Sequence, residues 1–311
     1  MLSRGDLTDD EWAVLEPLLP KSNNRCGRWR DHRQVINGVI RRLSTGCQWR
    51  ELHDRFFPWQ TVHKRHMLWS ADGTWEVLLQ HVQAVADAKG DIVWDINVDS
   101  TSVRAHQHAA GHTKGAAGTV QLLKRGRTKI RSPARALSPA LVPGGGGAAG
   151  EVLGRSRGRL MTKLHLAAEG KCRPLSLVIT PGQQADCTQF EPVMNKIRAP
   201  RPGLGRPCPR PDSVSTDKAY SNRKTRTYLR KRGIRHVIPE KRDQVAGRLR
   251  RGSRGGRPPG FDTERCKKRS AVERSINKLK QFRAVATRYD KRGYIYLGTV
   301  TAAAVLIWLR S

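Results

Sequence analysis

Acidic residues are scarce in this sequence. The 311-residue chain has 26 Asp and Glu against 59 Lys and Arg, a formal net charge of +33 with histidine neutral. A surplus of that size goes far beyond what solubility requires, and it predicts a polyanionic partner. Nucleic acid is the first candidate, because a basic surface that neutralises phosphates releases counterions and gains affinity independent of base sequence. Anionic membrane is the second.

Long apolar runs and a secretory signal are also lacking. The chain turns acidic at Asp6, where the apolar core of a signal peptide would follow, so we expect a cytoplasmic protein. The longest apolar run, residues 299–309, is shorter than the roughly 20 residues that cross a bilayer. It predicts a buried terminal helix and argues against a membrane partner.

Cysteine pairs are missing as well. The sequence has no Cys-x-x-Cys, and its six cysteines are scattered: Cys26, Cys47, Cys172, Cys187, Cys208 and Cys266. This spacing matches neither a zinc site nor a compact disulfide framework. Free thiols in a reducing compartment are expected.

Residues 1–88 are predicted to form an all-helical domain. Thr8 and Glu11 fit a capping box at the start of a first helix, and a second apolar stripe stops at Gly46. Two further stretches, 62–69 and 75–85, continue the helical spacing. The expected core anchors of this domain are its tryptophans: Trp12, Trp49, Trp59, Trp69 and Trp75.

Residues 89–311 are predicted to form an α/β domain. A first strand is expected within the β-rich segment 91–100, where the alternating apolar row ends at Val98, and further strands are expected at 163–168, 173–180, 213–216 and 234–239. The strands at 163–168 and 173–180 form a hairpin. Helices are expected at 222–232, 270–289 and 297–309. Two intervals rich in Gly, Pro and Arg, 111–158 and 241–260, are predicted to be loop insertions that stay disordered until something anionic contacts them.

Three acidic residues stand out by their positions. Asp99 follows the first predicted strand, Asp217 follows the fourth, and Glu273 lies on a late helix. A rigid α/β core can hold such a cluster, and hard oxygen ligands suit Mg²⁺ or Mn²⁺. Two such ions about 4 Å apart stabilise the attacking and leaving oxygens of a displacement at phosphorus. Taken singly, each acid is weak evidence, because such a residue is more often found in a turn, at a cap or on a solvated helix face.

The helix that carries Glu273 has a polar and an apolar stripe. The polar stripe points a carboxylate and cations the same way, and its members are Arg269, Glu273, Asn277 and Lys280. An ordinary salt-bridged helix face explains this pattern, as does an acid that holds metal beside cations that hold phosphates. Spacing alone leaves both interpretations open.

Several motifs occur together along the chain. The segment 269–273 places Arg269 four residues before Glu273, and Lys280 follows after six more residues. This pattern resembles the Tyr-x2-Arg-x3-Glu-x6-Lys signature of DDE transposases from bacterial insertion sequences of the IS four and IS five groups. Other segments resemble further motifs of that family: 98–106 and 216–221 its first two acid motifs, 156–165 and 180–186 its intervening hairpin, and 7–12, 46–52 and 69–75 its N-terminal helical domain.

The resemblance implies an RNase H-like fold, a mixed β-sheet flanked by helices. Asp99, Asp217 and Glu273 would form its metal-binding acid triad for Mg²⁺ or Mn²⁺, and Arg269 and Lys280 would contact the DNA backbone. Cys266 stands where the signature has Tyr, so the contact of that ring is missing. The interval 111–158 is longer than the usual connection in the family, which is typical of either a tolerated insertion or a decaying copy.

Two further groups of residues have competing interpretations. Asp186 can serve as an auxiliary acid, but its Gly-rich surroundings favour a plain turn. The histidines without zinc spacing are expected to be structural or to contact DNA: His106, His108, His165 and His236.

Basic residues of the N-terminal domain lie on or near predicted helix starts and faces: Arg28, Arg30, Lys64 and Arg65. They favour a helix-turn-helix reader of the terminal repeats of the element. The alternative is a basic helical bundle that only packs on the catalytic domain.

The function predicted from these features is that of a transposase. It binds terminal inverted repeats, nicks the ends to expose 3′-hydroxyls and joins them to target double-stranded DNA, with no covalent protein intermediate. Synapsis of two ends implies a homo-oligomer on DNA, and the protein is expected to be associated with the nucleoid when bound. The alternatives are a catalytically inactive or domesticated DNA-binding protein and a simple metal-dependent nuclease.

Overall fold

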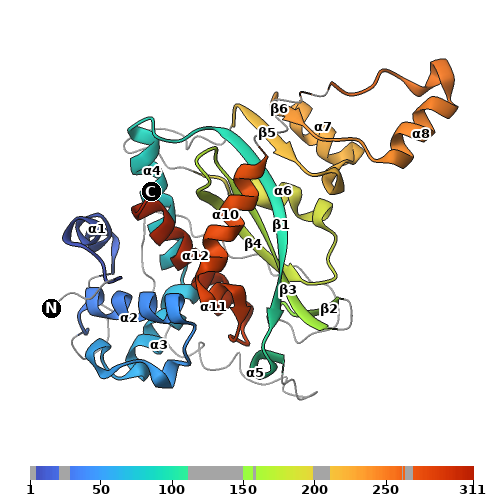
Figure 1. Ribbon diagram of the computed structural model, residues 1–311. Helices are drawn as coiled ribbons and strands as arrows, with labels where there is room; N and C mark the ends of the chain where they lie inside the picture. Colours follow the sequence, from blue (N-terminus) through green and yellow to red (C-terminus); the bar gives the residue numbers. More distant parts are fainter. Residues whose placement is uncertain are drawn as a thin grey trace, which may run out of the picture.

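The computed structural model describes residues 5–20, 29–110, 150–156, 159–198, 211–260, 262 and 269–311. These residues form a mixed α/β fold. A seven-stranded sheet has helices on both of its faces, and a group of N-terminal helices lies beside it (Figure 1).

The N-terminal region is helical, as predicted. Its elements, with the short 3₁₀ helices labelled η, are α1 (Asp9–Leu15), η1 (Glu16–Leu18), α2 (His32–Thr45), η2 (Trp49–Glu51), η3 (Asp54–Phe56), α3 (Trp59–Ala71) and α4 (Thr74–Ala88). The capping box is confirmed, because the Thr8 hydroxyl accepts from the Glu11 N–H and the Glu11 carboxylate accepts from the Thr8 N–H. Gly46 ends α2 in the left-handed conformation, with φ of 67°.

The five tryptophans are not all core anchors. Trp69 and Trp75 are buried, whereas Trp12, Trp49 and Trp59 are only partly buried against the core. The prediction is wrong for these three because the rings cover the rim of the core. The ring of Trp49 lies under the guanidinium of Arg42, and that of Trp59 under Arg50.

The sheet joins antiparallel and parallel strands. Its members are β1 (Asp95–Ala105), β2 (Gly154–Ser156), β3 (Arg159–Ala168), β4 (Pro174–Pro181), β5 (Ser213–Thr216), β6 (Arg235–Val237) and β7 (Thr287–Arg288). The order is β2-β3-β1-β5-β6, with β4 beside β3 and β7 beside β1. β3 pairs antiparallel with β1 on one side and with β4 on the other, and β5 and β6 continue the sheet parallel to β1.

Several element boundaries differ from the predictions, and two of these differences concern the elements that carry Asp99 and Glu273. β1 begins at Asp95, not at residue 91, and extends to Ala105 because it pairs with β3 through Arg104. The helix expected over 270–289 ends at Gln281, where Phe282 becomes extended. The short helix α11 (Arg283–Ala286) and strand β7 take up the remainder, and β7 adds to the end of β1.

Helices cover both faces of the sheet (Figure 1). On one face lie η5 (Asp186–Gln189), α6 (Phe190–Lys196), η6 (Lys218–Tyr220) and α7 (Arg223–Lys231), and on the other α10 (Ser270–Gln281), α11 and α12 (Gly293–Leu309). α12 is almost wholly buried, as predicted for the last apolar run, and it packs against α3, α4 and β4. Among the described residues, no helix is long and apolar enough to span a membrane.

The two predicted loop insertions have different outcomes. Most of the first, residues 111–149, lies outside the described residues, and its end forms β2 on the edge of β3. The second, 241–260, is not a loop: it contains α8 (Arg242–Arg250) and η7 (Gly252–Gly255). The helix forms because Gln244 Oε1 accepts from the Lys241 N–H and because an acid lies in the first turn and arginines in the last.

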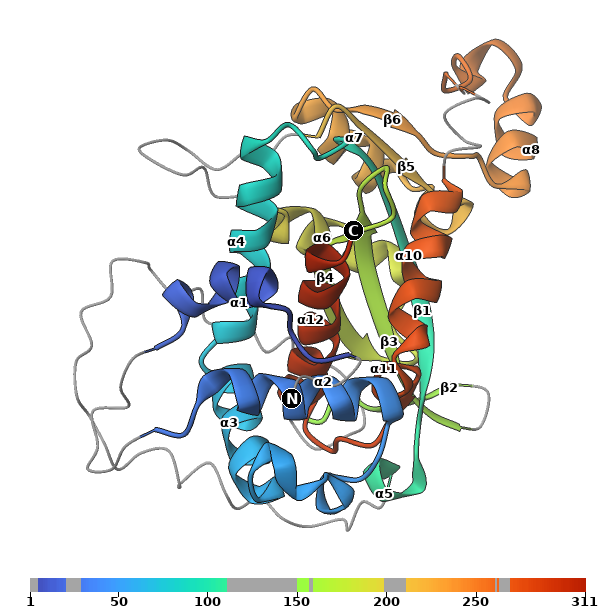
Figure 2. The same ribbon diagram turned by 60° about the vertical axis from the view of Figure 1, so that its left-hand side comes forward.

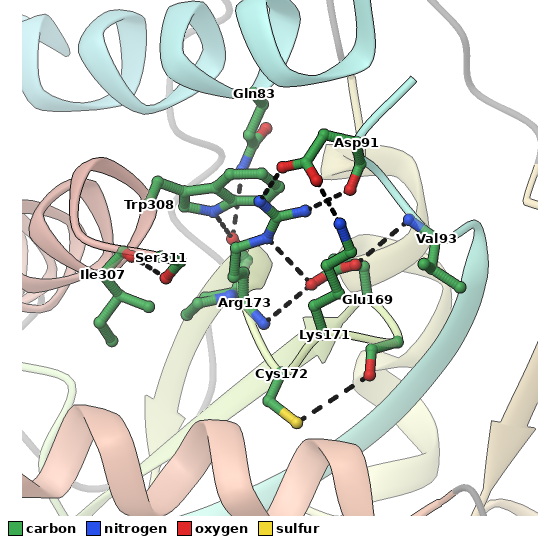
Figure 3. A network of polar contacts seen from close by, with 12 residues as sticks. Gln83, Asp91, Val93, Glu169, Lys171, Cys172, Arg173, Ile307, Trp308 and Ser311 are labelled. Carbon is green, nitrogen blue, oxygen red and sulfur yellow. Dashed lines mark hydrogen bonds and ion pairs between the residues drawn. The ribbon is translucent and has the colours of Figure 1, made fainter. Parts of the chain in front are cut away.

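A buried ion pair fixes the turn of the β3–β4 hairpin (Figure 3). Arg173, 2 % exposed, donates to Glu169 at 3.0 Å and to the Asp91 carboxylate at 2.6 Å. Its guanidinium lies over the ring of Trp308, whose indole N–H donates to the Pro174 carbonyl at 2.6 Å. The network therefore ties the hairpin to the start of β1 and to the end of α12 (Figure 3).

Candidate active site

Asp99 and Asp217 lie side by side where β5 ends. β1 and β5 run parallel with Val98 beside Thr216, so the next residue on each chain segment is an aspartate. Asp217 leads directly into η6, whereas β1 continues to Ala105. Asp99 therefore lies inside its strand and not after it, which corrects the predicted position. The register of the parallel pair is what brings the two carboxylates together.

Asp99 is a half-buried carboxyl group surrounded by other charges. Burial raises the pKa of Asp99 above its ordinary value, and the charges of Asp217 and Asp186 raise it further. The Ser100 N–H, which donates to Asp99 Oδ1 at 2.8 Å, and the guanidinium of Arg269 act in the opposite direction. A carboxylate near other carboxylates is stabilised by a cation, so the electrostatics at this point favour cation binding.

Glu273 is linked to the aspartates through Arg269. The Arg269 guanidinium lies 3.8 Å from Asp217 Oδ1 and 3.5 Å from Glu273 Oε1. Glu273 occupies the first turn of α10, and its side chain is 56 % exposed. The polar stripe predicted for this helix thus faces the end of β5, with an arginine between two of the three acids.

Asp186 belongs to the same cluster, which overturns the preference for a plain turn. Asp186 Oδ1 accepts from Ser100 Oγ at 2.7 Å and lies 3.0 Å from Lys163 Nζ. Asp186 begins η5 after β4, and the hairpin of β3 and β4 carries it to β1. The only sequence signal was the motif at 180–186, whose glycine suggested a turn.

The other cation of the polar stripe contacts the acid-bearing strand. Lys280 Nζ donates to Thr101 Oγ1 at 2.6 Å, and burial lowers the pKa of Lys280. Lys280 lies on the same helix as Glu273, and Thr101 lies shortly after Asp99. The two cations that the resemblance assigned to DNA backbone therefore both lie against the strands that carry the acids.

Two residues near the acids, the buried Tyr220 and the partly buried Lys163, were not singled out by the sequence. Tyr220 is 1 % exposed; burial raises its pKa, and the charges of Asp186 and Asp99 raise it further. Lys163 pairs with Asp186 and also donates to the Gln184 carbonyl. His165, beside Lys163 on β3, is fully buried with its Nε2 at 2.8 Å from Thr180 Oγ1, and burial lowers its pKa to about 4. Such a histidine is neutral and structural.

The donor set suits a divalent metal if one side chain moves. Asp99 and Asp217 offer hard oxygen ligands side by side, and the raised pKa of Asp99 reflects buried negative charge in need of a cation. Among the described residues, however, no three His, Cys, Asp or Glu side chains are grouped so that they hold a metal ion. Glu273 faces Arg269 instead. For Glu273 to serve as the third carboxylate ligand, its side chain must therefore leave Arg269.

A cleft opens beside Asp217. Its volume is about 570 Å³, and it is lined by Asp217, Lys218, Ala219, Glu240, Lys241 and Arg242. The first three follow β5, and the last three lead into α8. An anionic group that enters this cleft meets three cationic side chains next to the acid site.

The predicted DNA-binding residues of the N-terminal region lie in different settings. Arg28 is outside the described residues. Arg30 and Lys64 are exposed, and Arg30 lies over the ring of Phe57. Arg65 is half-buried, and packing already engages its guanidinium. The guanidinium carbon lies 3.8 Å from the centroid of the Trp29 ring and 5.6 Å from that of Trp69, and a guanidinium nitrogen lies 2.7 Å from His32 Nδ1.

Cysteines contribute nothing to the site in the part of the chain that the structure describes. Cys47, Cys172 and Cys187 are free thiols, in accord with the prediction. Cys266, the departure from the family signature, lies outside the described residues.

Comparison with known proteins defines the class first. Residues 94–308, more than half of the chain, match the family described as "Transposase DDE domain". The chain belongs to this family, as the resemblance predicted, and is an enzyme of the DDE transposase type, a class that depends in general on divalent metal ions. Within the class, residues 7–79 match a second family, "Putative transposase of IS4/5 family".

Curated relatives come from insertion sequences. The chain is 31% identical over 140 residues to a "Putative transposase for insertion sequence element IS402" from Burkholderia cepacia, covering 45% of this chain and 59% of that protein. It is 26% identical over 151 residues to a "Putative transposase for insertion sequence element IS6501" from Brucella ovis, covering 49% of this chain and 100% of that protein. Each match spans less than half of this chain.

Among solved structures, the "Mos1 transposase paired-end complex with left transposon end" is 12% identical and covers 83% of this chain and 80% of that chain. The TM-score is 0.23, too low to argue for a shared fold.

Proposed function

We propose that this transposase binds the terminal inverted repeats of an insertion sequence, cleaves DNA strands at those ends and joins the exposed 3′-hydroxyls to target double-stranded DNA. Asp99, Asp217 and Glu273 are its catalytic acids and hold Mg²⁺ or Mn²⁺. The observation that carries the proposal is the pair of aspartates on adjacent parallel strands, with Glu273 and Arg269 beside them on α10. The mixed sheet with helices on both faces supports an RNase H-like catalytic domain.

Different residues of this chain have different roles at the phosphate that is cut. Divalent ions, when bound, stabilise the attacking and leaving oxygens of the displacement. The Ser100 N–H orients Asp99 Oδ1, while the Ser100 hydroxyl is held by Asp186. Arg269 and Lys280 offer positive charge to the DNA backbone on either side of Glu273. No nucleophilic side chain is needed, because water or a 3′-hydroxyl attacks the phosphorus.

Recognition of the DNA ends is assigned to the N-terminal helices. Arg28, Arg30, Lys64 and Arg65 supply the positive charge there, and the exposed Arg30 and Lys64 are free to approach phosphates. Because two ends must be held together, we propose a homo-oligomer on DNA. We also propose a cytoplasmic protein that associates with the nucleoid through DNA.

The acids are tested one at a time in a strand-cleavage assay. Asp99→Asn, Asp217→Asn and Glu273→Gln are each expected to reduce cleavage of an end-containing duplex by about a hundredfold or more, because each removes a charged metal ligand. DNA binding, measured by fluorescence anisotropy without metal, should change less than about threefold, because the basic surfaces that supply counterion release stay intact. Asp10→Asn, on the exposed start of α1, is the matched control and should cleave normally.

Two outcomes favour the alternatives. If the unmutated protein binds end-containing DNA but never cuts it with Mg²⁺ or Mn²⁺, the chain is a catalytically inactive DNA-binding protein. If it cuts but leaves no joined products in a plasmid assay, it is a simple nuclease.

A further inference from the structure

Residues 241–260 form a basic arm that neither the acid site nor the N-terminal helices explain. The basic arm consists of α8, η7 and the residues up to Gly260, and Figures 1 and 2 show α8 projecting beyond β6 and α7. The sequence of the arm has seven Lys and Arg residues and a single acid, Asp243. No residue of α8 is buried.

Packing against the rest of the protein does not explain why α8 is present. Leu249 is 72 % exposed, more than any other large hydrophobic side chain that the structure describes. A helix of this length gains little stability by itself, and its arginines repel one another. A protruding cationic helix without an apolar contact face is typical of a surface that meets a polyanion.

The root of the basic arm is fixed to the segment that follows Asp217. Gln244 Nε2 donates to the Ser221 carbonyl at 2.7 Å, and Ser221 Oγ donates to Gln244 Oε1 at 2.8 Å. Arg226 of α7 donates to Ser221 Oγ at 3.2 Å and to the Ile238 carbonyl at 2.8 Å. The position of the arm is thereby tied to the end of β5, where the acids lie.

The cleft beside Asp217 separates the root of the basic arm from the acid site. Lys218 faces Lys241 and Arg242 across its volume of about 570 Å³. Glu240 also lines it, but this carboxylate is neutralised by Arg248 at 2.9 Å. The volume falls within the range of about 300 to 1,000 Å³ typical of pockets for small ligands, and three cationic side chains line it, which favours an anionic group such as a phosphate.

We propose that the basic arm is a clamp for the phosphate backbone of duplex DNA next to the bond cut at the acid site. Its exposed arginines contact phosphates irrespective of base sequence: Arg250, Arg251, Arg254 and Arg257. The location of the cut rests on the proposed function. The affinity of the arm for DNA does not, because it is measured without metal and without cleavage.

The salt dependence of binding tests the clamp. A full-length variant with these four arginines changed to Gln is compared with a matched variant in which four exposed cations elsewhere are changed to Gln: Lys89, Arg198, Arg230 and Lys231. Each phosphate contact contributes about −0.9 to the slope of log K against log salt, so the loss of four contacts in the arm variant should reduce the magnitude of the slope by about 3.6 and the affinity at least tenfold at roughly 0.15 M salt. The matched variant should lose less than about 1. Equal losses in the two variants would overturn the proposal, because net charge alone would then explain the binding.

Proteolysis supplies a second measurement on the unmutated protein. Trypsin cleaves after exposed arginines, so duplex DNA should slow cleavage after Arg250, Arg251 and Arg254 at least tenfold. Unchanged cleavage there in a saturated DNA complex overturns the clamp. Stronger protection by duplex RNA of the same length overturns the assignment to DNA.

The two proposals fail separately. If Asp99→Asn still cuts DNA while the arm variant shows the expected slope, the proposed acid site is wrong and the clamp stands. If the acid variants are inactive and the arm variant binds like its matched control, the clamp is wrong and the acid site stands.

Discussion

Opposing electrostatic effects act on the carboxyl group of Asp99. It is half-buried and lies near the carboxylates of Asp217 and Asp186, a setting that disfavours its own charge and raises its pKa. The Ser100 N–H and Arg269 offset only part of this effect. The folded protein therefore keeps an unfavourable cluster of negative charge, and a divalent cation relieves it. Strain of this kind at a binding site commonly costs stability in the free protein.

The first prediction follows from the sign of that shift. Asp99→Asn should raise the midpoint of thermal unfolding at pH 7, although it abolishes cleavage. Because the folded-state pKa is above the unfolded value, ionised Asp99 destabilises the fold above its folded pKa, and the penalty fades as pH falls toward the unfolded value. The gain should thus shrink on acidification. Differential scanning calorimetry without metal measures it, and Asp10→Asn serves as the control.

A lower unfolding midpoint for Asp99→Asn than for the unmutated protein would show that the carboxylate stabilises the fold. The charge cluster described here would then be incorrect.

Only part of this site can be predicted from sequence. Asp99 and Asp217 are recognisable because each lies in a strand context within a family motif. The contact of Asp186 with the site is not recognisable, because its partner Ser100 lies 86 residues earlier in the sequence. The glycine in the motif that contains Asp186 is typical of a turn. The Glu273 side chain contacts Arg269 and not the aspartates. Helical periodicity does not predict which of several neighbouring groups a side chain contacts.

At the scale of elements, the approach of α12 to α3 depends on one glycine. A Cβ added to Gly298 would lie 2.6 Å from Ser70 Cβ and 3.3 Å from Ser70 Cα. No real pair of carbons tolerates the first of these distances, so one helix must shift. The two helices belong to opposite ends of the chain, and their contact joins the N-terminal region to the sheet.

We therefore expect Gly298→Ala to destabilise the protein by about 1 to 3 kcal/mol, because overpacking outweighs the better helix propensity of Ala. Urea unfolding measures the change. Ser70→Gly combined with Gly298→Ala should recover part of the loss by removing the clashing Cβ. Gly247→Ala is the matched control, since its added Cβ meets nothing within 4 Å on the exposed α8. A neutral Gly298→Ala would show that the helices are free to separate.

Elements with an apolar stripe or a clear cap are predictable, and elements without them are not. α2 has an apolar stripe that ends at Gly46, and α12 contains a continuous apolar run, so the sequence indicates both helices. α8 has no buried residue, and the composition of 241–260 therefore resembles that of a disordered loop. The helix is stabilised by local hydrogen bonds of Gln244, which composition does not predict. The length of β1 is set by its partner β3, which a local pattern does not include.

At the scale of the whole molecule, the N-terminal helices and the sheet share one hydrophobic core. The predicted boundary at residue 88 falls between α4 and β1, yet α4 packs on α12 from the far end of the chain. Arg42 of α2 also forms a buried ion pair at 3.1 Å with Asp290, which lies between β7 and α12. Arg310 bonds to Glu11 at 2.9 Å, which joins the C-terminal helix to α1. The N-terminal helices, which we propose to contact the DNA ends, and the sheet that carries the aspartates thus share one packed core.

His66 lies at the centre of that contact. It is 1 % exposed on α3, its Nδ1 accepts from the indole N–H of Trp75 at 3.2 Å, and its Nε2 lies 3.1 Å from Thr299 Oγ1 of α12. An indole nitrogen only donates, so Nδ1 carries no proton. Burial lowers the pKa of His66 to about 3; Asp290 acts against this shift, and Arg42 and His63 add to it.

Acidification should therefore lower the free energy of unfolding of the protein. In the unfolded chain His66 is protonated below its ordinary pKa of 6.5, whereas in the folded chain it stays neutral until the pH falls to about 3. The free energy of unfolding therefore decreases as the pH falls from 6.5 to about 3. One such group contributes about 1.4 kcal/mol per pH unit to the slope. His66→Gln should flatten the dependence of the unfolding free energy between pH 7 and 5 by about that amount, while the exposed His108→Gln leaves it unchanged. The same slope in both variants would show that His66 already accepts a proton in the folded protein. The joint between the N-terminal helices and α12 would then have to accommodate a buried charge beside Arg42, which its packing opposes.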